Sequence, residues 1–121
     1  MKHYNIEKLQ CVETAVYYAQ SRPNFKIIMF VSSPKEVAEI LNSLEQAADP
    51  LIYSINLRRY NINFVNGSTI LFKPKHQKEA CRGLSFSMVI APTELFADDV
   101  FSAACIPSLD YQDGILVKYE S

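Results

Sequence analysis

The sequence predicts an α/β fold in which a sheet of mainly parallel strands is joined by helical crossovers and carries one β-hairpin. Residues 26–31 and 87–91 are almost continuously apolar, which is typical of strands that are buried on both faces of a sheet. A helical pattern follows each run, as expected when helices connect parallel strands. Asn66-Gly67 separates two further β-rich runs and indicates a hairpin, because both residues tolerate the positive φ of a type I′ turn.

Two helices are expected in the first half of the chain. Apolar residues recur at helical spacing from residue 5 to residue 20, with Asn5 as the N-cap. The second helix is expected at residues 34–47, where Ser33 can act as the cap and Glu36 completes a capping box. These two helices flank the first apolar strand.

The second half of the chain is expected to begin with the hairpin and to end with a strand. The hairpin strands are residues 61–65 and 68–72, and the polar residues 73–82 form a loop or a short helix. A helix follows at residues 94–104, and the last strand at residues 115–119. The expected order is therefore helix, strand, helix, hairpin, strand, helix, strand.

The length of 121 residues matches a single domain, 1–121, and no linker or internal repeat interrupts it. Cys11, Cys81 and Cys105 are far apart in the sequence and lack the spacing of a zinc site, so we expect them to be reduced and buried. No apolar run approaches the ~20 residues of a membrane span, and the N-terminus lacks the apolar region of a secretion signal. These features predict a cytoplasmic protein without a membrane partner.

Charge is distributed unevenly along the chain, although the formal net charge is only −1. Residues 56–82 hold six basic side chains and one acidic side chain, whereas residues 83–121 hold one basic and six acidic side chains. A basic segment can contact phosphate groups, but it can also face the acidic third of the same fold, and we favour the second interpretation. The candidate phosphate or nucleic-acid contacts are Arg58, Arg59, Lys73, Lys75, Lys78 and Arg82.

No motif in the sequence specifies a catalytic centre. A glycine-rich phosphate loop and a nucleophile elbow are both absent. His3 and His76 have no partner at a fixed spacing and are interpreted as solvated side chains. Asp98-Asp99 could bind a divalent cation, but a place on a helix surface explains the pair more simply. The sequence therefore predicts no catalytic residue, no cofactor and no metal site.

Two short motifs nevertheless resemble a known family. Asn-Gly-Ser at residues 66–68 and Arg-Gly-Leu-Ser at residues 82–85 occur in the order and spacing found in the ATPase domain of phage terminase large subunits, a RecA-like P-loop fold. In that family a hairpin with Asn-Gly-Ser precedes an Arg-Gly-x-Ser turn, which leads into the Walker B strand. The similarity covers nearly the whole chain in element order, and the strand at 115–119 falls where the family's ATPase-coupling strand lies. The resemblance implies a truncated, terminase ATPase-like fold.

The chain departs from this family at the residues that hydrolyse ATP. The family begins the region with a phosphate-binding loop ending in Gly-Lys-Thr, but residues 3–8 contain no glycine to form the nest of N–H groups that holds phosphate. The Walker B strand of the family ends in Asp-Glu, where this chain has Pro92 and Thr93, and Glu94 lies one place late. The resemblance therefore implies a degenerate ATPase that is not an enzyme.

The strand before the phosphate loop is a second expected departure. In a complete terminase ATPase domain this strand lies in the middle of the sheet, and here only residues 1–4 precede the expected first helix. An unpaired central edge would be costly, because its backbone groups would lack hydrogen-bond partners. We therefore expect either a compacted sheet or a partner, such as a second copy of the chain, that supplies the strand.

Three functions remain open at this point. The first is a non-catalytic, terminase-like phage or prophage protein that binds a protein partner in DNA packaging or regulation, in the cytoplasm of the host cell. The second is a small nucleic-acid-binding protein that uses the basic residues of segment 58–82, with Tyr60 or Phe72 stacking on bases. The third is an ATPase that another chain completes in trans. We favour the first.

Overall fold

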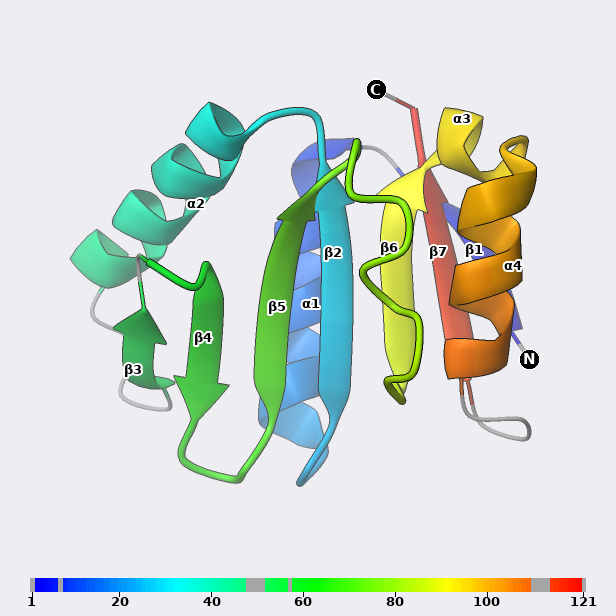
Figure 1. Ribbon diagram of the computed structural model, residues 1–121. Helices are drawn as coiled ribbons and strands as arrows, with labels where there is room; N and C mark the ends of the chain where they lie inside the picture. The colour runs from blue at the N-terminus through cyan, green and yellow to red at the C-terminus, as the bar shows by residue number, and fades with distance from the viewer. Residues whose placement is uncertain (1, 7, 48–51, 57, 110–113, 121) are drawn as a thin grey trace.

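The computed structural model describes residues 2–6, 8–47, 52–56, 58–109 and 114–120. Within them, one sheet has the strand order β1-β7-β6-β2-β5-β4-β3, with helices on both faces (Figure 1). The predicted α/β class, with a mainly parallel sheet, is confirmed. The elements in chain order are β1 (Lys2–Ile6), α1 (Lys8–Ser21), β2 (Lys26–Val31), α2 (Pro34–Ala47), β3 (Ile52–Asn56), β4 (Asn61–Phe64), β5 (Thr69–Pro74), β6 (Met88–Pro92), α3 (Thr93–Phe96), α4 (Asp99–Ser108) and β7 (Ile115–Tyr119).

The apolar strand β2 contributes to a core on each side of the sheet. Ile27 and Met29 pack in the core that includes residues of α1 and α2. Ile28 and Phe30 pack in the opposite core, where Phe101 of α4 meets the ring of Phe30 edge to face, with centroids 5.1 Å apart. Successive side chains of a strand point to opposite faces, so a strand covered on both faces must be apolar at every position.

The N-terminal residues form a strand, which corrects the expectation that too few residues precede the first helix. β1 pairs in parallel with β7 at one edge of the sheet, and Asn5 lies in this strand instead of capping α1. The buried strands pair directly, since β6 is hydrogen-bonded to β2 on one side and to β7 on the other. The sheet is therefore continuous from β1 to β3 without a strand from a partner, and β1 lies at its edge, not at its centre.

The hairpin is present, but its turn differs from the prediction. β4 and β5 are antiparallel, and the N–H of Gly67 donates to the carbonyl of Phe64 at 3.1 Å. Gly67 has a φ of +87°, whereas Asn66 is not in the left-handed region. The loop therefore has one more residue than a type I′ turn, with glycine at the single position that requires positive φ.

The Asn-Gly-Ser motif fastens this hairpin to the end of α1. The Asn66 Nδ2 donates to the carbonyl oxygens of Ala19 at 2.7 Å and Arg22 at 3.2 Å. The Ser68 hydroxyl is fully buried; it donates to the Arg22 carbonyl at 2.6 Å and accepts from the Phe25 N–H at 3.0 Å. A helix end has carbonyl groups without helical partners, and these two side chains satisfy them.

Two further elements differ from the predictions. β3 pairs with β4 at the second edge of the sheet and was not expected. After β5, the residues up to 82 form successive turns, which agrees with the expected loop. The helix expected at 94–104 is divided into α3 and α4, because the Asp98 carboxylate accepts from the N–H groups of Val100 and Phe101 and caps a new helix. By contrast, α2 has its expected bounds, and the Ser33 hydroxyl accepts from the Glu36 N–H at 3.4 Å.

Candidate functional sites

The carboxyl ends of the five parallel strands lie at one edge of the sheet, the place where open α/β proteins bind ligands. Two groups of side chains occur there. One lies beyond β5, where the turn between β3 and β4 approaches, and includes predicted basic residues. The other lies beyond β6 and β7, where the family resemblance places the ATPase chemistry.

Three of the six predicted basic contacts pair with acidic side chains. Lys75 Nζ lies 2.9 Å from Glu94 Oε1, and Arg82 Nη2 lies 2.8 Å from Glu79 Oε1. Lys78 forms an ion pair with the Asp98 carboxylate, and it is the main cause that holds the pKa of Asp98 below its ordinary value. Since Glu94 and Asp98 belong to the acidic third of the chain, the favoured interpretation of the basic segment is confirmed for Lys75 and Lys78.

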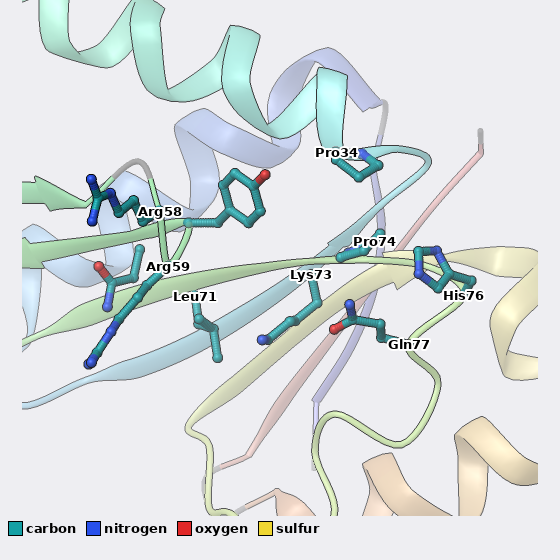
Figure 2. A pocket seen from close by; sticks show the side chains of 10 residues that line it. Pro34, Arg58, Arg59, Leu71, Lys73, Pro74, His76 and Gln77 are labelled. Carbon is teal, nitrogen blue, oxygen red and sulfur yellow. The ribbon is translucent and has the colours of Figure 1, made fainter.

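The other three predicted contacts, Arg58, Arg59 and Lys73, line one pocket of about 540 Å3 (Figure 2). In Figure 2 Arg59 and Lys73 extend on the same side of the sheet, while Arg58 leaves the turn in another direction. The remaining lining residues, of which only Tyr60 was predicted to take part in binding, are Pro34, Tyr60, Asn61, Leu71, Pro74, His76 and Gln77. Within the basic segment, Lys75, Lys78 and Arg82 thus form ion pairs inside the protein. Arg58, Arg59 and Lys73 instead line the pocket.

The predicted base-stacking residues are not both available. Phe72 is fully buried in the core beneath α1 and α2, so the prediction that it stacks on a base is wrong. Tyr60 is partly buried against the same core, and it has a φ of +54°. His76 is exposed, as predicted. The pocket therefore presents charged and hydrogen-bonding groups more than aromatic faces.

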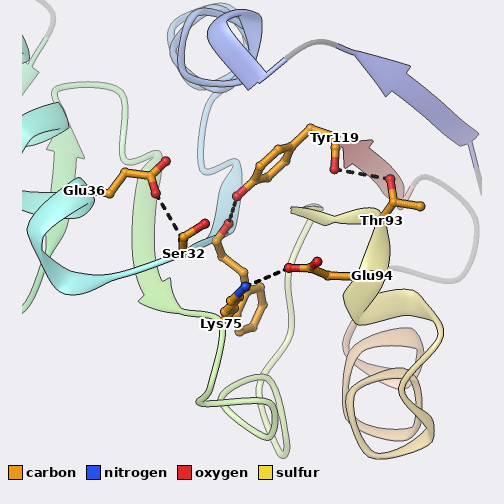
Figure 3. A network of polar contacts seen from close by, with 7 residues as sticks. Ser32, Glu36, Lys75, Thr93, Glu94 and Tyr119 are labelled. Atoms are coloured by element: carbon orange, nitrogen blue, oxygen red, sulfur yellow. Dashed lines mark hydrogen bonds and ion pairs between the residues drawn. The ribbon is translucent and has the colours of Figure 1, made fainter. Parts of the chain in front are cut away.

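At the ends of β6 and β7, polar side chains bond to one another and to the backbone (Figure 3). Thr93 Oγ1 donates to the carbonyl oxygen of Tyr119 at 3.2 Å, and Glu94 is occupied by Lys75. Pro92 is buried as the last residue of β6. In the part of the chain that the structure describes, no group of three or more His, Cys, Asp or Glu side chains is placed to hold a metal ion.

The Tyr119 side chain crosses the end of β6. Its hydroxyl donates to the carbonyl of Phe30 in β2 at 2.6 Å, although Tyr119 itself belongs to β7 (Figure 3). Burial raises the pKa of this phenol well above its ordinary value, and the nearby carboxylate of Glu36 adds to the effect. The phenol therefore stays neutral, and its hydrogen bond links β7 to β2 at the carboxyl ends of the parallel strands.

The connection between β1 and α1 leaves little room for a phosphate-binding loop. β1 ends at Ile6 and α1 begins at Lys8, so one residue separates strand from helix. A P-loop places several residues, glycines among them, between strand and helix so that their N–H groups surround the phosphates.

The cysteines and the Arg-Gly turn have structural explanations. All three cysteines are buried, as predicted, and none forms a disulfide bond within the described residues. The thiols of Cys81 and Cys105 are hydrogen-bonded to each other, and this contact, together with burial, raises the pKa of Cys105. Gly83 has a φ of +77° and Arg82 pairs with Glu79, which agrees with the structural interpretation of this turn.

The fold is similar to that of a known phage protein. An arginine-to-alanine mutant of the large terminase ATPase domain of Thermus phage P74-26 superposes with a TM-score of 0.65 and 16% sequence identity, over 98% of this chain. The chain spans 58% of the length of that chain. Neither a protein-family model nor a curated protein sequence matches. Among the described residues, no helix is long and apolar enough to cross a membrane. The chain therefore has a terminase ATPase-like α/β fold, as the two sequence motifs predicted.

Proposed function

We propose that this chain is a non-catalytic, terminase-like protein of a phage or prophage that binds a protein partner, in DNA packaging or its regulation. The likeness in fold to a phage terminase ATPase domain supports the phage context. The exposed apolar side of α4 carries the proposal of a protein partner.

Helix α4 carries apolar side chains on its buried side and on its solvent side. Phe101, Ala104 and Cys105 are buried against the sheet. On the solvent side, Val100 is 48% exposed and Ile106 is 40% exposed. The exposed residues Ala103 and Pro107 complete the apolar part of this side, which we call the α4 outer face, defined by Val100, Ala103, Ile106 and Pro107. Exposed Asp99 lies beside them, and an apolar patch with a charged neighbour fits a protein partner.

Replacing Val100 and Ile106 together by glutamate is expected to abolish capture of the partner, because two charges would be buried in an apolar contact. The measurement is affinity capture from cells that carry the phage, followed by reconstitution of the captured protein with the purified chain. The matched control is Tyr17→Glu with Val65→Glu, which adds the same charges at two other exposed apolar positions. Equal capture by both double variants would contradict the proposed face. Concentration-dependent dimers that only Val100→Glu/Ile106→Glu disrupts would identify the partner as a second copy.

The residues at the carboxyl ends of the parallel strands support the proposal that the chain does not hydrolyse ATP. Pro92 and Thr93 offer no carboxylate for magnesium, Glu94 is bonded to Lys75, and one residue separates β1 from α1. We expect no hydrolysis of ATP in the presence of magnesium above the rate without protein, measured as phosphate release. ATP turnover that disappears with Glu94→Gln or Lys8→Gln would refute this proposal. If that turnover required a second protein, it would favour an ATPase that another chain completes.

A further inference from the structure

Arg59 and Lys73 line the same pocket at the open face of the sheet. Arg59 lies in the turn that precedes β4, and Lys73 lies near the end of β5. Leu71 packs against the core on the α4 side of the sheet, so Lys73 points to that same side. Like charges that are gathered in one pocket repel each other, and a bound anion would relieve that repulsion.

No acidic side chain relieves this repulsion within the described residues. The ion pairs found there involve Lys75, Lys78 and Arg82, and none involves Arg58, Arg59 or Lys73. The pocket lining contains no aspartate or glutamate. The pocket therefore carries a local positive potential in a chain whose formal net charge is −1.

Hydrogen bonds hold the backbone of the turn that carries Arg58 and Arg59. A buried side-chain oxygen of one lining residue, Asn61, has no hydrogen-bond donor among the described residues. Asn56 Oδ1 accepts from the N–H groups of Arg58 at 3.0 Å and Arg59 at 3.1 Å, which holds the turn between β3 and β4. Asn61 Oδ1 is buried and accepts no hydrogen bond from the residues that the structure describes. A ligand that fits the pocket should therefore combine an anion for the cations with an N–H or O–H group for Asn61.

We propose that this pocket binds a nucleotide unit of single-stranded nucleic acid, with its phosphate at Arg59 and Lys73. A guanidinium presents paired donors to phosphate oxygens, and a lysine adds a point charge. The sugar or base supplies the donor for Asn61. The face of β4 and β5 next to the pocket is not covered by a helix (Figure 1), and it carries the polar side chains of Asn63 and Thr69 along the direction a strand could follow.

The site is independent of the proposed protein partner and of ATP hydrolysis. It uses side chains on β4, β5 and the preceding turn, whereas the α4 outer face belongs to another element. Failure of one proposal therefore leaves the other standing. The test below needs only the purified chain.

The test measures binding of a labelled single-stranded DNA oligonucleotide by fluorescence anisotropy, over a range of salt concentrations. Arg59→Gln combined with Lys73→Gln is expected to weaken binding at least about tenfold, because two charge-assisted contacts are lost. The slope of log affinity against log salt should fall by about 1.4, which is two contacts at about 0.7 each. The control is Lys26→Gln with Arg82→Gln, which removes the same charge from exposed positions outside the pocket.

Thermal unfolding of both double variants establishes that they are folded. If the two double variants weakened oligonucleotide binding equally, the proposed site would be wrong, because the loss of net positive charge would explain the effect. Absence of oligonucleotide binding by the unmodified chain would overturn the proposal. Pyrophosphate and ATP serve as competitors: if they bind at Arg59 and Lys73 while the oligonucleotide does not, the ligand is a free phosphate compound and the assignment to a nucleic-acid strand is wrong.

Discussion

Gly67→Ala is expected to lower the free energy of unfolding by about 2–4 kcal/mol and the melting temperature by roughly 10 °C. Gly67 has a φ of +87°, where an L-residue with a Cβ costs about 1–2 kcal/mol. A Cβ there would also lie 2.3 Å from Asn24 Oδ1, so that side chain must move. The added strain is comparable to overpacking, at about 1–2 kcal/mol. Thermal and denaturant unfolding would measure both effects together.

Gly83 provides the matched control for this substitution. It also has positive φ, at +77°, but a Cβ there would meet nothing within 4 Å. Gly83→Ala should therefore show the backbone cost alone, at about 1–2 kcal/mol. Adding Asn24→Gly to Gly67→Ala should bring the loss near that of Gly83→Ala. Equal losses for the two single alanine variants would show that the contact with Asn24 is unimportant.

Asn66→Asp is expected to destabilise the protein by about 3 kcal/mol near neutral pH. The Asn66 amide donates to the carbonyls of Ala19 and Arg22, and a carboxylate at that place would face these oxygens without a donor. The facing carbonyls should raise the pKa of the introduced carboxyl above its ordinary value of about 3.9. Protonation of the introduced carboxyl restores a hydrogen-bond donor, so the loss of stability should become smaller as the pH falls through that raised pKa. Unfolding of both proteins, measured over a pH series, tests the size of the destabilisation and the direction in which it changes with pH.

Asn63→Asp makes the same chemical change on the same hairpin. Among the described residues, the Asn63 amide donates to the Ser54 hydroxyl at 3.1 Å, on the open face of the sheet. Water can replace this contact, so a loss within about 1 kcal/mol is expected. A deficit for Asn66→Asp no larger than that for Asn63→Asp would mean that the link between hairpin and helix contributes little.

The sequence predicted correctly the elements whose signals lie within a few neighbouring residues. β2 and β7 have the predicted bounds, because their apolar runs are bordered by turn residues. α2 also has its predicted bounds, because its cap residues specify the start. β1 and β3 were missed because they lie at the sheet edges, where long-range pairing and not composition decides that a segment is extended.

The pocket could not be predicted because it depends on hairpin register. A two-residue type I′ turn would pair β4 and β5 one residue away from the observed register, in which Asn61 lies opposite Leu71. A shift of one residue moves side chains to the other face of a strand, so the predicted turn would have changed which side chains line the pocket. The ion pairs of Lys75 and Lys78 also join segments about twenty residues apart, and no spacing rule reveals them.

The place of β7 between β1 and β6 has a consequence for synthesis. β7 follows every other described strand in the chain, yet it alone connects β1 to the rest of the sheet. As the ribosome releases the chain from its N-terminus, the facing edges of β1 and β6 remain unpaired until residues 115–119 emerge. Exposed strand edges recruit other chains, and pairing over such a sequence distance is slow. The nascent chain is therefore most vulnerable to aggregation after β6 has emerged and before β7 has emerged.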